Sequence, residues 1–134
     1  MIYLASPYTH PDPVVRDARF RAACRQAAEM FRCGIPVFSP IAYSHAIAAQ
    51  ELPLDWDFWE RFDRAFMEVC TEVWVLTLDG WRESRGVQAE IVLARQMGKP
   101  VSFVEPGDAL TDQTPVAAVR AGAGRSGESF DATL

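Results

Sequence analysis

The sequence predicts a single α/β domain in which a parallel sheet is covered by helices on both faces. Four short apolar segments, at residues 2–5, 35–38, 73–78 and 101–104, show no regular alternation of polar and apolar residues, which is typical of buried parallel strands. Segments with helical periodicity lie between successive strands, as the crossovers of a parallel sheet require. With 134 residues, of which 49% are apolar, the chain can bury a core of its own.

The first strand and the first helix are predicted from one apolar run and one long periodic segment. Residues 2–5 form the strand, and a loop that contains three prolines follows at residues 6–13. The helix is predicted from about Val14 to Arg32, with Gly34 as the glycine that closes it. Its core side is expected to carry Val15, Ala22, Ala23, Ala27, Met30 and Phe31.

The second strand is followed by a loop and a further helix. Residues 35–38 form the strand, in which Pro36 suits the first residues or an exposed edge. We predict a loop over residues 39–45 and a short helical turn over 46–50. Asp55 then caps a helix that runs to about Val69, with Asp63 at the border of its apolar face. That face is predicted to consist of Phe58, Trp59, Phe62, Ala65, Phe66 and Val69.

The segment from residue 81 to residue 100 contains the most informative pattern of the chain. A helix is predicted from about Arg85 to Gly98, with Val87, Ile91, Leu93, Ala94 and Met97 on its apolar face. Glu90 falls in the middle of that face, where an ionised carboxylate is costly unless a partner or a function requires it. Ser84 and Gly86 lie at the strand-to-helix turn, where backbone N–H groups and a hydroxyl can hold a phosphate or another anion.

Composition excludes several classes of function. The net charge of −5 and the pI near 5.0 argue against broad binding to nucleic acid or to an anionic membrane. No apolar run approaches membrane-spanning length, and three cysteines without a Cys-x-x-Cys pair favour a reduced, cytoplasmic protein. Two histidines without an acidic cluster argue against a metal site. We expect one domain over residues 1–106, and a partly flexible extension over 107–134 with a short helix within 111–121.

The candidate site follows from the edge at which parallel strands end. Ligands of such folds bind there, and this edge would carry residues 6–8, 39–45 and 79–86. Two carboxyl groups in apolar surroundings can serve as acid and nucleophile in a retaining glycosidic cleavage, when they lie about 5 Å apart.

From the residues alone, Glu90 could equally be paired with an arginine, and Asp63 could be an ordinary surface acid. His45 and Tyr8 could contact a substrate or could simply pack, and the Trp56–Phe62 aromatic residues could fill the core or a subunit interface.

Residues 1–104 resemble the nucleoside 2-deoxyribosyltransferase superfamily, which includes deoxyribonucleotide N-hydrolases. The resemblance rests on Tyr3-Leu-Ala-Ser6, on Ser84-x-Gly86-x-x-x-Glu90 with Gly98-Lys-Pro100 after it, and on an upstream helical aspartate. It implies a flavodoxin-like or Rossmann-like fold and a homodimer or higher homo-oligomer, because members usually complete their sites across subunits. It implies no metal or organic cofactor.

The resemblance also implies a role for each matching residue. Glu90 would be the nucleophile, Asp63 the acid that assists departure of the base, and Tyr3 the residue that orients the nucleophile. Ser84 and Gly86 would contact a 5′-phosphate. Ser6, Tyr8 and His45 complete the set of residues that we expect to bind substrate.

The expected function is therefore cleavage of the N-glycosidic bond of a nucleoside or nucleoside 5′-monophosphate, 2′-deoxy forms included, by a hydrolase or a base-exchanging transferase. The alternative from another class is a nucleotide- or nucleotide-sugar-binding module without turnover, which would need no nucleophile. A third reading is a Rossmann-like phosphate-sugar enzyme in which Glu90 is a general base. Stereochemistry distinguishes the third, because a covalent mechanism predicts retention at the anomeric carbon.

Overall fold

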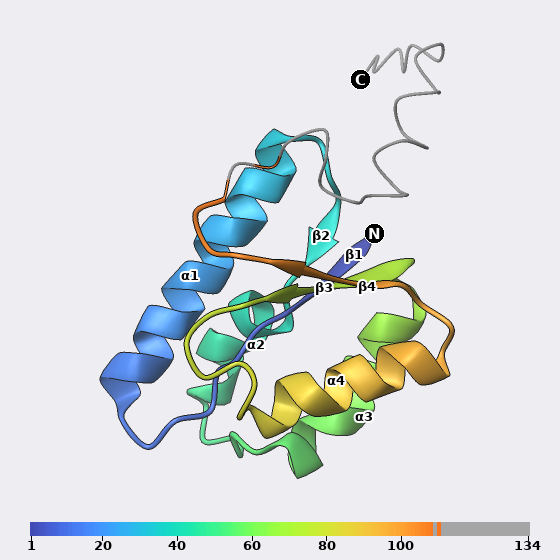
Figure 1. Ribbon diagram of the computed structural model, residues 1–134. Helices are drawn as coiled ribbons and strands as arrows, with labels where there is room; N and C mark the ends of the chain where they lie inside the picture. Colours follow the sequence, from blue (N-terminus) through green and yellow to red (C-terminus); the bar gives the residue numbers. More distant parts are fainter. Residues whose placement is uncertain (109, 111–134) are drawn as a thin grey trace, which may run out of the picture.

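The computed structural model describes residues 1–108 and residue 110, which form a four-stranded parallel sheet with helices on both faces (Figure 1). The strands are β1 (Ile2–Ala5), β2 (Val37–Phe38), β3 (Glu72–Leu76) and β4 (Val101–Val104). The helices are α1 (Pro13–Arg32), α2 (Pro40–Ala48), α3 (Trp56–Glu68) and α4 (Arg85–Gln96). The expected three-layer α/β fold is confirmed. The short helix and flexible segment expected within residues 111–134 lie outside the described residues.

The strand order is β2-β1-β3-β4, and all three pairings are parallel. This is the order of the first four strands of a flavodoxin-like sheet. The chain leaves β1 in one direction, towards β2, and later returns past β1 to form β3 on its other side. The carboxyl ends of β1 and β3 therefore flank the switch point at which such folds bind ligands.

Each face of the sheet has its own apolar cluster. On one face, Ala27 and Met30 of α1 pack with Ile2, Leu4, Trp74 and Leu76 of the two central strands. On the other face, Met67 of α3 and the buried side of α4 pack against the alternate strand residues Tyr3, Ala5, Val73 and Val75. Figure 1 shows α1 on one side of the sheet and α3 with α4 on the other. Within the described residues, no helix is long and apolar enough to cross a membrane.

The segment expected to be a loop at residues 39–45 belongs to α2, and this prediction is wrong. Ser39 is the N-cap, and its Oγ accepts a hydrogen bond from the Ala42 N–H at 3.1 Å. Pro40 occupies the first helical position, where its missing N–H costs nothing. The helix begins six residues earlier than expected because capping chemistry, rather than an apolar stripe, defines it.

Two expected core faces also differ from the structure. Phe31, placed on the core side of α1, is 60% exposed, because the neighbouring Met30 already fills the sheet-facing position of the last turn. On α3, Phe62, Ala65 and Val69 face outward, whereas Asp63 and Met67 are buried. The helix is therefore rotated relative to the predicted orientation, which brings the carboxyl group of Asp63 inside.

Candidate functional site

A cavity of about 400 Å³ lies at the switch point, between the carboxyl ends of the central strands and helices α2, α3 and α4. Its lining includes six of the eight residues predicted from the sequence: Ser6, Tyr8, Asp63, Ser84, Gly86 and Glu90. These residues come from the loop after β1, from α3 and from the start of α4. The fold thus gathers groups that are up to 84 positions apart in sequence, between Ser6 and Glu90.

Glu90 lies on the buried side of α4, with 6% of its surface exposed. Burial raises the pKa of its carboxyl group to about 8, and the nearby Asp63 carboxyl adds to that rise. Asp63 is 9% exposed, and burial raises its pKa to about 7. Neither carboxyl group is in an ion pair with a described residue. No arginine of the described residues therefore neutralises Glu90, and the burial of Asp63 contradicts its interpretation as a surface acid.

Tyr3 lies behind the cavity rather than in its wall. Its side chain is fully buried in the α3–α4 face of the sheet, and its hydroxyl has no hydrogen-bond partner of regular geometry. The hydroxyl is nevertheless close enough to the Glu90 carboxyl to lower the pKa of that group, while burial and the two acids raise the pKa of Tyr3 itself. Tyr3 can thus donate a hydrogen bond to Glu90 from behind the cavity.

The start of α4 forms the rim of the cavity. Ser84 is the N-cap, and its Oγ accepts a hydrogen bond from the Val87 N–H at 3.2 Å, which leaves the hydroxyl proton to donate elsewhere. A Cβ added to Gly86 would lie 3.9 Å from Glu90 Oε1 and 4.0 Å from Ser84 Oγ. Gly86 therefore keeps open the space between the N-cap hydroxyl and the buried carboxyl group.

His45 does not line the cavity, but it contacts Tyr8, which does. The Tyr8 hydroxyl and His45 Nδ1 are 2.7 Å apart, and the imidazole ring stacks on Phe20 of α1 with centroids 4.0 Å apart. The histidine thus fixes the orientation of the Tyr8 ring in the wall. Deeper in the cavity, the buried Ser6 hydroxyl has no hydrogen-bond partner among the described residues, so a ligand could satisfy it.

Sequence reasoning missed part of the wall. The sequence allowed either a core or a subunit-interface role for Trp56 and Trp59. In the structure, both residues line the cavity. A bidentate ion pair, Arg85 Nη2 to Asp57 Oδ1 at 2.7 Å and Nη1 to Oδ2 at 3.2 Å, ties the first turn of α3 to the start of α4. Four residues of α2, which was expected to be mostly loop, also contribute: Pro40, Ile41, Ser44 and Ala48. The Ser39-Pro40 pair was the available signal for that helix.

The cavity contains the groups that acid–base chemistry needs. Among residues 1–108 and 110, no group of three or more His, Cys, Asp or Glu side chains could hold a metal ion. Burial raises the pKa of both carboxyl groups, and the Asp63 carboxyl raises that of Glu90 further; a carboxyl pair of this kind retains one proton over an intermediate pH range. One acid and one carboxylate can thus be present together.

Comparison with known protein families identifies one that the chain matches over most of its length. No curated protein matches the chain. A family model described as a domain of unknown function, DUF1937, matches residues 1–106, which include every residue of the cavity. The chain belongs to the DUF1937 family.

Proposed function

We propose that the protein cleaves the N-glycosidic bond of a nucleoside or nucleoside 5′-monophosphate, with Glu90 as the nucleophile and Asp63 as the acid. The observation that carries this proposal is the burial of both carboxyl groups in the wall of one cavity, where no described residue forms an ion pair with either. Natural cores rarely contain unpaired carboxyl groups unless they have a use. The motif resemblance to nucleoside 2-deoxyribosyltransferases supports the same assignment.

The proposed reaction has two steps. In the first, a Glu90 carboxylate oxygen bonds to the anomeric carbon, the bond from that carbon to the base breaks, and Asp63 gives its proton to the departing base. In the second, water or another base attacks the glycosyl ester and releases Glu90, while Asp63 takes up the proton of the attacking group. Water yields a hydrolase and a second base yields a transferase. The two carboxyl groups supply both roles, so the proposal needs no metal or organic cofactor.

The proton held by this pair of carboxyl groups sets a requirement for the mechanism. Burial raises the pKa of both groups, so the pair retains a proton near neutral pH. The reaction needs the proton on Asp63. A substrate hydroxyl that donates to Glu90, together with the Tyr3 hydroxyl, would favour the carboxylate form of Glu90. The mechanism therefore assigns substrate binding a role in activating the nucleophile.

The wall of the cavity supports a substrate with an aromatic base. Trp56, Trp59 and Tyr8 provide ring surface, and ring surface of this kind binds bases by stacking. The cavity offers less support for a phosphate group on the substrate. The start of α4 offers N–H groups and the Ser84 hydroxyl, but Arg85, the cation in the lining, is already paired with Asp57. The proposal therefore includes both nucleosides and their 5′-monophosphates.

The first experiment is chromatographic detection of free base from a panel of nucleosides and 5′-monophosphates, in ribo and deoxy forms. Each compound is incubated with and without a second base. Release that disappears in the Glu90→Gln variant supports the proposal, and the acceptor dependence separates hydrolase from transferase. No release from any compound by correctly folded protein would reject it.

A nucleotide-binding module without turnover is the second candidate, and one observation favours it. Burial raises the pKa of Glu90 to about 8, so this group is mostly neutral near pH 7, and a neutral carboxylic acid is a poor nucleophile. Calorimetry with the same compounds tests this candidate. This candidate predicts that the wild-type protein binds one of the compounds without ever releasing its base. It also predicts that the Glu90→Gln variant binds the same compound equally well.

The proposal extends to a homodimer or higher homo-oligomer. Four apolar side chains of α2, of α3 and of the residue that caps α3 are substantially exposed: Tyr43, Ile47, Phe62 and Val69. The two helices adjoin, because the Tyr43 and Phe66 rings contact each other with centroids 5.7 Å apart. A second copy of the chain would remove this surface from water. Both helices also form walls of the cavity, so such contact would stabilise the site.

A further inference from the structure

The loops that follow the two central strands are joined by one side chain, Arg19 of α1. Its Nη1 donates hydrogen bonds to the Thr9 carbonyl at 3.0 Å and to the Tyr8 carbonyl at 3.4 Å, in the loop after β1. Its Nη2 donates to the Asp79 carbonyl at 3.2 Å, in the loop after β3. Tyr8 and Thr9 line the cavity that contains Glu90, whereas Arg19 does not. The guanidinium therefore fixes the two loops relative to each other from outside the cavity.

The chemistry of arginine suits this bridge. Arg19 is in no ion pair with a described residue, so backbone carbonyls rather than a carboxylate hold its guanidinium in place. A guanidinium donates from nitrogens at a fixed spacing, whereas a lysine ammonium is a single centre. Gly80 permits the close approach, because a Cβ at this position would lie 2.7 Å from Arg19 Nη2. The contact with Arg19 thus favours glycine here, as does the φ of +88°.

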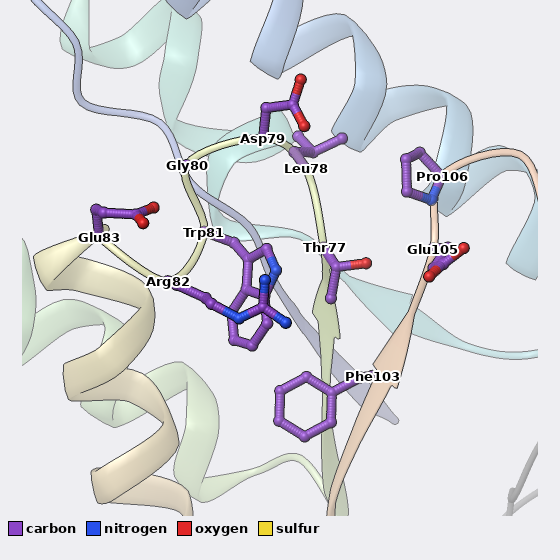
Figure 2. Close-up of a pocket in the computed structure, with 10 residues that line it drawn as sticks. All are labelled: Thr77, Leu78, Asp79, Gly80, Trp81, Arg82, Glu83, Phe103, Glu105 and Pro106. Carbon is purple, nitrogen blue, oxygen red and sulfur yellow. The ribbon is translucent and has the colours of Figure 1, made fainter.

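From the carbonyl that Arg19 holds, a hydrogen-bonded turn leads to the rim of the cavity. The Trp81 N–H donates to the Leu78 carbonyl at 3.0 Å, and the Ser84 N–H donates to the Trp81 carbonyl at 3.3 Å. The Gln88 side chain donates to the same Trp81 carbonyl at 3.3 Å. Figure 2 shows this turn in the wall of a neighbouring pocket and its continuation into α4. The position of the N-cap Ser84 therefore depends on the point at which Arg19 holds the start of the turn.

The same guanidinium holds the opposite side of the cavity. The loop after β1 carries Ser6, Tyr8 and Thr9, which all belong to the lining. Thr9 Oγ1 also donates to the Leu54 carbonyl at 3.0 Å, and Leu54 lines the cavity as well. Thr9 is thus tied to Arg19 through its carbonyl and to the segment before α3 through its hydroxyl. Three parts of the wall therefore share one anchor.

We propose that Arg19 is a positioning residue for substrate binding, which keeps the loop after β1 and the start of α4 at the separation that the ligand requires. The inference rests on the proposed function for the identity of the ligand. The hydrogen bonds of Arg19 go to loops and not to α3 or α4, which carry Asp63 and Glu90. Loss of Arg19 should therefore weaken binding and leave the chemical step unchanged.

Steady-state kinetics of base release, with the compound that the panel identifies, gives the first test. Arg19→Ala should raise KM at least about fivefold and change kcat by less than about twofold. Arg19→Lys keeps the charge without the spaced donors, so it should restore KM only in part. Arg16→Ala is the matched control, because Arg16 is a half-buried arginine of the same helix that donates to the His10 and Pro11 carbonyls. A loss in kcat with KM unchanged, full rescue by lysine, or equal effects of Arg19→Ala and Arg16→Ala would overturn the proposal.

A glycine substitution tests the same contact while the arginine is retained. Gly80→Ala places a methyl group against Arg19 Nη2, which must then move away from the Asp79 carbonyl. KM should rise about as much as in Arg19→Ala, and the double variant should be no worse than either single variant. Gly34→Ala is the control, because its φ of +74° imposes the same backbone strain but nothing lies within 4 Å of the added Cβ. Equal effects of the two glycine variants, or additive effects in the double variant, would contradict a role that acts through the loop after β3.

Hydrogen exchange, measured by mass spectrometry, tests the positioning independently of the proposed function. The segment 78–84 contains the amides of Trp81 and Ser84, which donate within the turn. Exchange in this segment should accelerate at least about tenfold in the two variants that break the bridge, and in neither control. If a compound binds without release of base, its dissociation constant takes the place of KM. Accelerated exchange in a protein whose wild type neither binds nor cleaves any compound would reject the proposed function alone, whereas unchanged exchange would overturn the role of Arg19.

Discussion

The carboxyl groups of Glu90 and Asp63 come from different helices and face one cavity, and the Asp63 carboxyl raises the pKa of Glu90 beyond the rise that burial causes. Glu90 is the more buried, and its pKa is about 8, against about 7 for Asp63. Both values lie well above those of carboxyl groups in water. Folding therefore takes up protons at these positions between about pH 4 and pH 8.

The first prediction concerns stability as a function of pH. Because the folded-state pKa values of both acids are raised, the native state binds more protons than the unfolded state, and the free energy of unfolding falls as pH rises from about 5 to 9. Glu90→Gln removes the larger part of this dependence. The variant should match the wild type at about pH 5 and exceed its stability by a few kcal/mol at about pH 9.

Urea unfolding at the two pH values measures this effect. Asp55→Asn is the control, because it removes an exposed carboxyl group from the lining of the same cavity. A Glu90→Gln protein with the same pH dependence as the wild type would show that Glu90 is not the buried acid that the structure describes.

The second prediction separates the two proposed roles. Asp63→Asn removes the proton donor, so base release should fall by about 10²–10⁴-fold for bases that leave poorly. For bases that leave easily without protonation, the loss should be much smaller. Glu90→Gln should abolish release for both kinds. Parallel kinetics with a poorly leaving and an easily leaving base provide the measurement, and equal losses in Asp63→Asn for the two substrates would exclude Asp63 as the acid.

The third prediction concerns the phosphate. Ser84→Ala removes the N-cap of α4 and should destabilise the protein by about 1 kcal/mol. Release from 5′-monophosphates should suffer more than release from nucleosides. Ser84→Asp retains a capping side chain but adds a negative charge, so it should restore stability and lower activity on monophosphates only. If both substrates lose activity equally in the two variants, Ser84 does not contact a phosphate.

The fourth prediction concerns assembly. Val69 is the C-cap residue of α3 and is 69% exposed. Val69→Glu should leave the fold intact but convert a homo-oligomer into monomers, because a charge would be desolvated at the contact. Val92→Glu, at an exposed position of α4, is the control. Light scattering measures the mass, and a wild-type protein that is monomeric at high concentration would disprove the oligomer.

The sequence was sufficient for the strands, for α4 and for the position of Glu90. Short apolar runs and a 3.6-residue period determine these features locally, and a charged residue within an apolar stripe is conspicuous. The orientation of α3 was not predictable, because its apolar stripe is wider than the surface that the sheet can cover. Packing places Asp63 and Met67 inside and leaves Val69 outside. Only the assembled layers decide between such orientations.

The cavity wall was harder to predict for a related reason. α2 carries few buried residues, Pro40 and Ala48 among its nine positions, and shows no apolar periodicity. Trp56 and Trp59 resemble core residues in the sequence, since large apolar side chains at a helix start serve equally well in a core, a contact or a cavity. Which of these roles Trp56 and Trp59 take depends on the element that faces them in the folded protein. The local sequence does not contain that information.

The last prediction concerns Gly86, which lies at helical φ and ψ in the first turn of α4. Gly86→Ala would place a methyl group in ordinary contact with Trp56, Glu90 and Ser84, at 3.8–4.0 Å. The fold should tolerate it and gain up to about 1 kcal/mol, because alanine loses less backbone entropy than glycine in a helix. The same methyl narrows the space between the N-cap hydroxyl and Glu90, so ligand binding and base release should fall.

Gly98→Ala is the control with the opposite pattern: its φ of +68° makes alanine destabilising by about 1 kcal/mol, and it lies outside the cavity. Thermal unfolding together with the base-release assay measures both effects, and a stable Gly86→Ala protein with undiminished activity would exclude this part of the cavity from the substrate site.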